Sequence, residues 1–214
     1  DNTLFYYLSG RVSNDGSTCW INYQGDEFNI VGNSEITIKL PPVPKDGTYE
    51  LRMGVSANSQ RGMFQIYWGT NKDRLPAIGS PIDMRMGGVY WYNQFGNHGG
   101  REPSTLGWED DIEGEDILNA EIDKRLRNNG YMKGPNSFWM WTRSATSDIS
   151  TQHARRRGDS LRKILLTEEM RADETYYLRF KSVLPNNRTE FYLDYLEFCE
   201  SNVYDSLVQP EDIW

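Results

Sequence analysis

The sequence contains few of the residues that usually form metal sites or nucleophilic catalytic sites. Its 214 residues include 2 cysteines and 2 histidines. The spacing of Cys19 and Cys199 matches no metal motif, and neither His98 nor His153 lies in a pattern typical of a zinc site or a Ser-His-Asp triad. The cysteines leave two interpretations open, a pair of buried thiols or a disulfide that joins the terminal strands. These scarcities argue against zinc and triad chemistry.

Long apolar runs and an excess of basic charge are also absent. No stretch approaches the roughly 20 consecutive apolar residues of a membrane-spanning helix. The formal net charge is −8. A surface of this sign repels phosphate backbones, so nucleic acid is not an expected partner. The basic run Arg155–Arg157 fits a solvated loop or a strand edge.

Apolar and polar residues alternate near the start of the chain, which predicts half-buried strands. In residues 35–40, Ile36, Ile38 and Leu40 fall on one face. Prolines and a turn signal at Asp46-Gly47 end this strand. Three more strands are predicted, over residues 48–55, 63–69 and 75–85, the last as an edge strand with bends at Pro76 and Pro81.

The end of the chain repeats the same pattern. Residues 160–170 are rich in apolar residues, and residues 176–183 and 190–198 alternate on either side of a polar turn. Short strands with turns between them predict an antiparallel β-sandwich.

Charged residues occupy the second face of two predicted strands. Glu50 and Arg52 alternate with apolar residues in one strand, and Arg179 does so in another. Such residues fit an exposed sheet face, a concave face or a cross-strand ion pair. The ion pair, with Asp194 or Glu50 as the partner, is the plainest interpretation.

The middle of the chain loses the strand pattern. Residues 87–135 are rich in glycine, asparagine and acids, and we expect the segment from about 87 to 160 to form an ordered insertion packed on the sandwich. One helix is predicted over residues 115–130, with Ile117, Ile122 and Leu126 on one face and Gly130 at its end. We therefore expect a single domain spanning residues 1–214.

Two stretches resemble a known fold family. The segment "ITIKLPPVPKDGTYELRMGVSANSQRGMFQIYWG", followed by "GSPIDMR", resembles the first half of galactose-binding-like jelly rolls, the fold of many carbohydrate-binding modules. The segment "ETYYLRFKSVLPNNRTEFYLDYLEFCE" resembles their closing strand pair. With "NNGYMKGPNSF", "LRKILLT" and "NVYDSLVQPEDIW", the chain resembles domains of gut-bacterial surface lipoproteins, often C-terminal in fasciclin-type proteins. The resemblance implies a jelly-roll β-sandwich in a cell-envelope protein.

Aromatic residues in the insertion are candidates for ligand binding. Sugars stack on aromatic faces while polar groups bond their hydroxyls. The triplet Tyr90, Trp91 and Tyr92 lies in a glycine-rich stretch, with Asn97 and Arg101 nearby as hydrogen-bond donors. Trp139 and Trp141 are two residues apart and would share a face of an extended segment. The alternative for each aromatic residue is packing of the insertion onto the sandwich.

An acidic stretch, residues 108–116, has three interpretations. It fits a solvated loop before a helix start, a calcium site at Asp110, Asp111 and Glu113, or the carboxylate pair of a glycosidase. The solvated loop is favoured and catalysis least, so we do not expect an enzyme, and apart from calcium we expect no cofactor.

The sequence as a whole predicts a non-catalytic module that binds carbohydrate or another surface ligand in a bacterial cell-envelope protein, linked to polysaccharide uptake. The alternative is an interaction or adhesion module that packs on a neighbouring domain. The expected partners are a glycan or a surface protein, and the expected location is the outer-membrane surface, with a lipoprotein signal segment upstream of Asp1.

Overall fold

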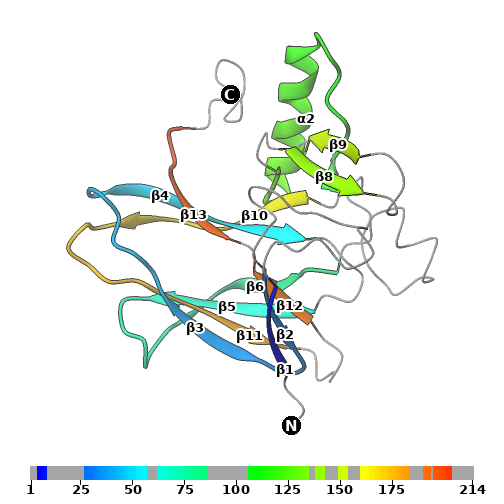
Figure 1. Cartoon of the computed structure of the whole chain (residues 1–214). Coiled ribbons are helices and arrows are strands. Elements are labelled where there is room, and N and C mark those ends of the chain that lie inside the picture. Colours follow the sequence, from blue (N-terminus) through cyan, green and yellow to red (C-terminus); the bar gives the residue numbers. More distant parts are fainter. Residues whose placement is uncertain are drawn as a thin grey trace.

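The fold is mostly β. The computed structural model describes residues 4–8, 27–56, 62–85, 106–134, 138–142, 149–153, 160–183, 190–193 and 195–203. Strands make up 51% of this part of the chain. They form three antiparallel sheets and a separate hairpin (Figure 1).

Each sheet is named here by its strand order. Sheet I consists of β13 (Leu196–Glu200), β4 (Gly47–Ser56), β10 (Ser160–Met170) and β7 (Tyr131–Lys133). Sheet II consists of β3 (Glu35–Lys39), β11 (Tyr177–Ser182), β5 (Met63–Gly69) and β6 (Ala77–Asp83). Sheet III consists of β1 (Leu4–Leu8), β2 (Glu27–Val31) and β12 (Glu190–Leu193). The hairpin pairs β8 (Phe138–Thr142) with β9 (Ile149–His153).

Strands from the two ends of the chain alternate within the sheets. In sheet I, β4 lies between β13 and β10, and in sheet II, β11 lies between β3 and β5. In sheet III, β2 pairs with β12. These pairings confirm an all-β, sandwich-like fold. The finer assignment to a jelly roll, and the division of the chain into one domain with an insertion, stay predictions.

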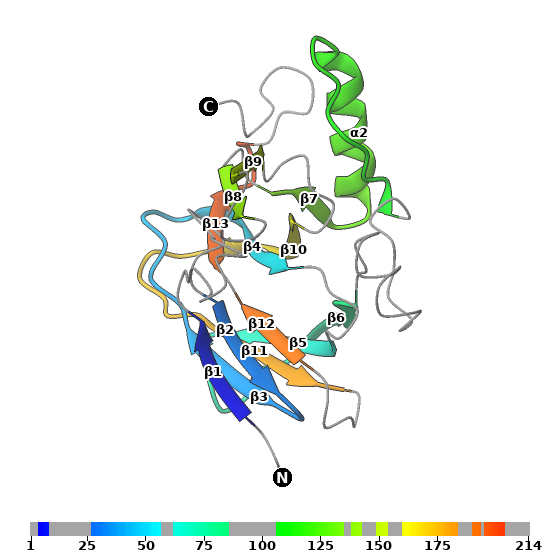
Figure 2. The same cartoon turned by 45° about the vertical axis from the view of Figure 1, so that its right-hand side comes forward.

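The main core lies between sheets I and II, with sheet III closing one side (Figure 2). As the alternation predicts, Tyr49, Leu51 and Met53 of β4 are buried on one face. Aromatic contacts join the layers. The ring of Phe191 lies 4.9 Å from that of Phe64 and 5.0 Å from that of Phe180, measured between centroids. Contacts of this kind add to the hydrophobic stabilisation that area alone provides.

Two sequence features explain the ends and edges of sheet II. Trp68 lies near the end of β5 and stacks on Tyr176 with ring centroids 5.1 Å apart, so it is a packing residue. Strand β6 lies at the edge of sheet II. Proline has no N–H to donate, and Pro81 is tolerated there because an edge strand pairs with a neighbour on one side only. The register between β5 and β6 shifts between Phe64 and Ile66, and the Gln65 side chain donates to the carbonyl of Ile78 at 2.9 Å across this irregularity.

The helix α2 (Asp116–Asn128) forms where the sequence predicts one. Gly130 follows its end with φ +75°, a left-handed conformation that glycine adopts without strain. Ile122 and Leu126 are buried as expected. Ile117 is 75% exposed, so the prediction that it shares the buried face of the helix was wrong. Each residue of an α-helix turns by about 100°, so five residues make one full turn plus about 140°. Ile117 therefore lies on a different side of α2 from Ile122.

Two other segments differ from expectation. Residues 131–133, expected within the insertion, form strand β7 and pair with β10 at the edge of sheet I. Residues 149–153, also expected within the insertion, form strand β9, which contains His153. Within the part of the chain that the structure describes, no helix is both long enough and apolar enough to cross a membrane.

Candidate functional site

The outer face of sheet I carries charged side chains that are buried. In β4, the side chains that alternate with the core residues are Glu50 and Arg52, which are only 3% and 1% exposed. Arg162 of β10, on the same face, is equally buried, and so is Lys133 of β7, which pairs with Leu161 and points its side chain away from that face. Charged groups are rarely buried to this degree unless they are paired, because removing them from water is costly. Their partners therefore define the site.

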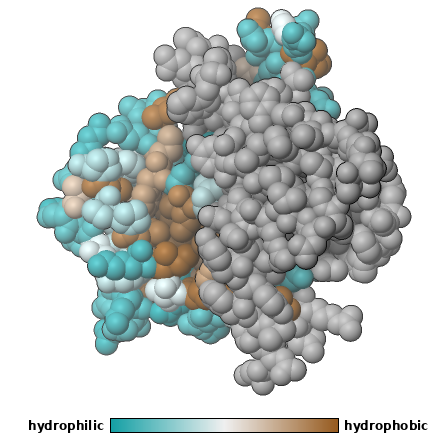
Figure 3. Space-filling view, viewed as in Figure 1, coloured by the Kyte–Doolittle hydropathy of each residue, from teal (hydrophilic) through white to brown (hydrophobic). Residues whose placement is uncertain are grey.

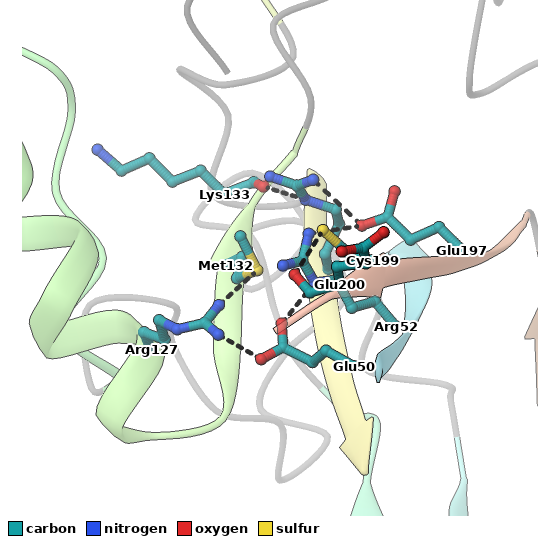
Figure 4. A network of polar contacts seen from close by, with 9 residues as sticks. Glu50, Arg52, Arg127, Met132, Lys133, Glu197, Cys199 and Glu200 are labelled. Atoms are coloured by element: carbon teal, nitrogen blue, oxygen red, sulfur yellow. Dashed lines mark hydrogen bonds and ion pairs between the residues drawn. The ribbon is translucent and has the colours of Figure 1, made fainter. Parts of the chain in front are cut away.

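Glu50 joins the sheet to the helix. Its Oε1 accepts a hydrogen bond from Arg52 Nε at 2.5 Å, and its Oε2 accepts one from Arg127 Nη2 near the end of α2 (Figure 4). Arg127 also donates to the sulfur of Met132. One carboxylate thus bonds two guanidinium groups, an arrangement stronger than bonds between neutral groups. The end of α2 is fixed over the sheet by this contact.

Glu197 of β13 occupies a similar position on the other side of Arg52. Its Oε1 accepts from Arg52 Nη1 and from Arg162 Nη1, each at 3.2 Å. Arg162 Nε donates to the backbone carbonyl of Lys133 at 2.9 Å. The side chain of Glu197 is 26% exposed, whereas Glu50 and both arginines are almost fully buried. Glu197 is therefore the carboxylate of this group that solvent or a ligand can reach.

Lys133 connects the sheet to the acidic stretch. Figure 4 shows its backbone carbonyl facing the arginine network while its side chain points away. The ammonium lies 2.5 Å from Asp111 Oδ1, 3.9 Å from Asp123 Oδ1 and 5.9 Å from the centre of the Trp108 ring. The side chains that make these contacts form the charged cluster: Glu50, Arg52, Asp111, Asp123, Arg127, Lys133, Arg162 and Glu197.

Within the described residues, the charged cluster holds equal numbers of cationic and anionic side chains. Four cationic side chains contact four carboxylates there. Among the described residues, no group of three or more His, Cys, Asp or Glu side chains could hold a metal ion. Of the residues named for a calcium site, Asp111 contacts Lys133, while Asp110 and Glu113 are exposed. The cluster can supply hydrogen-bond donors and acceptors to a neutral polar ligand.

Lys163 lies beside the charged cluster and has a different environment. Its ammonium donates to the carbonyl of Gly130 at 2.9 Å and lies 4.3 Å from the centre of the Tyr131 ring. Burial lowers the pKa of Lys163 to about 8, because desolvation disfavours the charged form.

The candidate sugar-binding residues of the insertion fall into two groups. Tyr90, Trp91, Tyr92, Asn97 and Arg101 lie outside the described residues. Trp139 and Trp141 lie in strand β8, opposite Gln152 and Ser150 of β9. Figures 1 and 2 both place the β8–β9 hairpin on the outer side of sheet I, the side on which α2 also lies.

The mid-strand arginines differ in their partners. Arg52 forms a cross-strand ion pair with Glu197, which lies directly opposite it, while Asp194 lies outside the described residues. It also pairs with Glu50 on its own strand. Arg179 lies on the outer face of sheet II, where it donates to Thr37 and to the carbonyl of Lys72. It also forms a cross-strand ion pair with Glu35 of β3 at 3.4 Å. The local pattern does not indicate that Arg52 is buried, because the cluster members Arg127 of α2 and Lys133 of β7 lie more than 70 residues downstream of it.

Comparisons with protein-family models, curated proteins and solved structures found no match for this chain. Its function is therefore argued from the geometry of the site and the sequence pattern.

Proposed function

We propose that this chain is a non-catalytic carbohydrate-binding module of a bacterial cell-envelope protein, linked to polysaccharide uptake. The observation that carries the proposal is the outer side of sheet I. There a partly exposed carboxylate, Glu197, is held between two buried arginines, and a hairpin that contains Trp139 and Trp141 lies on the same side.

This combination suits a sugar. A sugar ring presents C–H surfaces that pack on aromatic rings, and its hydroxyl groups bond to charged or amide side chains. Arg52 and Arg162 fix the position of Glu197, so its outward-facing lone pairs can accept from hydroxyls without first becoming ordered. Because successive strand residues alternate, positions 139 and 141 share one face of β8.

Charge balance narrows the ligand class. Among the described residues, the four cations of the charged cluster already contact four carboxylates, and the partly exposed side chain at the proposed site is the carboxylate of Glu197, so an anionic sugar would gain little attraction there. The whole chain carries a net charge of −8, which adds repulsion. The proposal therefore favours neutral polysaccharides over sulfated or uronic acid polymers. The envelope location is supported by the sequence resemblance alone.

The proposal is tested by screening the purified chain on an array of neutral and acidic glycans. We expect binding to a neutral class, and we expect Trp139→Ala, Trp91→Ala and Glu197→Gln each to weaken that binding at least fivefold. Tyr67→Ala, which removes an aromatic residue from the outer face of sheet II, is the matched control and should bind like the wild type.

Absence of binding to any glycan, or equal binding by the variants and the control, would reject the proposal. Release of reducing sugar from a bound glycan would reject its non-catalytic part.

A further inference from the structure

The start of α2 carries an exposed apolar surface that is separate from the charged cluster. Ile112, Ile117 and Leu118 are 47%, 75% and 38% exposed. They are three of the five large apolar side chains that are exposed in the described part of the chain. Single exposed apolar residues are common, but three within seven residues form a local patch. These three residues are named the tip surface.

The tip surface is held in place by hydrogen bonds. The Asn119 side chain accepts from the backbone N–H of Ile112 and donates to its carbonyl, both at 2.9 Å. The N–H of Glu115 bonds to the same carbonyl at 3.2 Å. The other end of the helix is buried through Leu126, which packs with Leu106. The apolar side chains are therefore presented by an ordered loop and helix, which lowers the entropic cost of binding a partner.

The tip surface is also accessible. Figures 1 and 2 show α2 standing away from the sheets, with its first turn at the far end. Figure 3 shows hydrophobic atoms among hydrophilic ones at this end of the molecule. A partner could cover the tip without contacting the strands.

Carboxylates surround the apolar side chains and fix the charge that a partner must carry. Asp110, Glu113, Glu115 and Asp116 are all exposed. The sequence contains no Lys or Arg between Leu106 and Asp123. One nearby acid, Glu109, is paired with Arg125 at 2.9 Å. Polyanions and anionic membranes are repelled by such a surface, whereas Lys and Arg side chains are attracted.

We propose that the tip surface binds a basic, amphipathic segment of a partner protein. Aliphatic side chains of that segment cover Ile112, Ile117 and Leu118, and its Lys and Arg side chains face the surrounding carboxylates. This mode resembles other cases in which one face of a partner helix supplies the apolar contacts. The proposal is independent of carbohydrate binding, since it uses neither the charged cluster nor the hairpin.

The test uses a fluorescent 14-residue peptide of Leu and Lys, patterned as an amphipathic helix, and measures anisotropy against the full chain. A peptide with Glu in place of Lys and one with Ser in place of Leu serve as probe controls. We expect the Leu/Lys peptide to bind at least tenfold more tightly than either control, because it alone offers both apolar contact and positive charge.

Variants then locate the binding. Ile117→Ser with Leu118→Ser should weaken binding at least tenfold. Val183→Ser with Val203→Ser, which changes two other exposed apolar residues, should leave it within twofold. Replacing Asp110, Glu113 and Asp116 with amides should weaken binding and reduce its salt dependence.

Three results would overturn the proposal. The first is equal binding of the Glu-containing peptide, and the second is unchanged binding by the Ile117→Ser, Leu118→Ser variant. The third is concentration-dependent self-association, seen by sedimentation and removed by the same variant, which would assign the surface to a second copy of the chain.

Discussion

At the scale of single residues, Glu50 is the side chain on which the buried charges most depend. It accepts from Arg52 and from Arg127, and it is 3% exposed. Breaking a buried ion pair from one side is far more costly than breaking a surface pair, because the remaining charge stays buried. The position of α2 on the sheet depends on the same carboxylate.

We therefore expect Glu50→Gln to lower the free energy of unfolding by about 3 kcal/mol. The measurement is urea denaturation followed by circular dichroism. Glu168→Gln, an exposed change in strand β10, is the control and should stay within about 0.5 kcal/mol of wild type. If Glu50→Gln lowered the free energy of unfolding as little as Glu168→Gln, Glu50 would be solvated and its ion pairs with the two arginines would contribute little.

Lys163 should make stability depend on pH in the alkaline range. Its pKa is lowered from 10.5 to about 8 by burial, so between these values the unfolded chain binds more protons than the folded chain. Stability must then rise with pH across this window. Below about pH 8 the folded state holds a charged lysine that is partly removed from water, and its stability is correspondingly lower.

The check compares wild type with Lys163→Met from pH 7 to pH 10. Because other groups titrate above pH 9, the informative quantity is the difference in unfolding free energy between the two proteins. We expect the unfolding free energy of the wild type to rise relative to that of Lys163→Met as the pH rises through 8. A difference that is flat or falls with pH would contradict the burial of this ammonium.

At the scale of elements, the Asn119 side chain fixes Ile112, in the loop before α2, to the helix. Asn119→Ala removes both bonds to the backbone of Ile112. Since these bonds are solvent-exposed, we expect a loss of only about 1 kcal/mol in stability. Amide hydrogen exchange at Ile112 should accelerate at least tenfold, while exchange at Ile164 in β10 stays unchanged.

Asn128→Ala, at an exposed position of the same helix, controls for helix propensity. Equal exchange at Ile112 in both variants would show that the loop is held by other contacts.

Elements were predictable from sequence where the pattern is local. The alternation in residues 35–40 and 176–183 predicts β3 and β11, and prolines and glycines give their limits. The buried side of α2 was less predictable, because Ile117 and Ile122 are both apolar while only Ile122 is buried. A pattern of residue types specifies an element more reliably than it specifies which side is covered.

The charged cluster could not be predicted in the same way. A charged residue on the second face of a strand ordinarily stays partly exposed, and this is the case for Arg179, whose side chain is 24% exposed. Arg52 is buried in contacts with Glu50 of its own strand and Glu197 of β13, and the contact with Glu197 spans 145 residues of sequence. No local signal encodes such a separation. The tryptophans of β8 were identifiable as candidates because their two-residue spacing is local.

At the scale of the whole molecule, the two ends of the chain form one set of sheets. Every strand of sheets I to III that precedes residue 84 pairs, directly or through one neighbour, with a strand that follows residue 160. We therefore expect a single cooperative unfolding transition, because neither end can keep its sheets without the other.

Phe180→Ala tests this cooperativity. Phe180 is fully buried and contacts Phe191, so its loss should cost about 3–5 kcal/mol. Tryptophan fluorescence and far-ultraviolet circular dichroism should report the same midpoint in wild type and variant. Two separated transitions would indicate that the ends of the chain fold as independent units.

The central claim is that a neutral glycan binds on the outer side of sheet I. The most direct measurement is a titration of the ¹⁵N-labelled chain with the glycan that binds best on the array, followed by amide chemical shifts. We predict the largest shifts in the β8–β9 hairpin and in β13 around Glu197. Shifts confined to sheet II or to the start of α2, or none at saturating glycan, would contradict the claim.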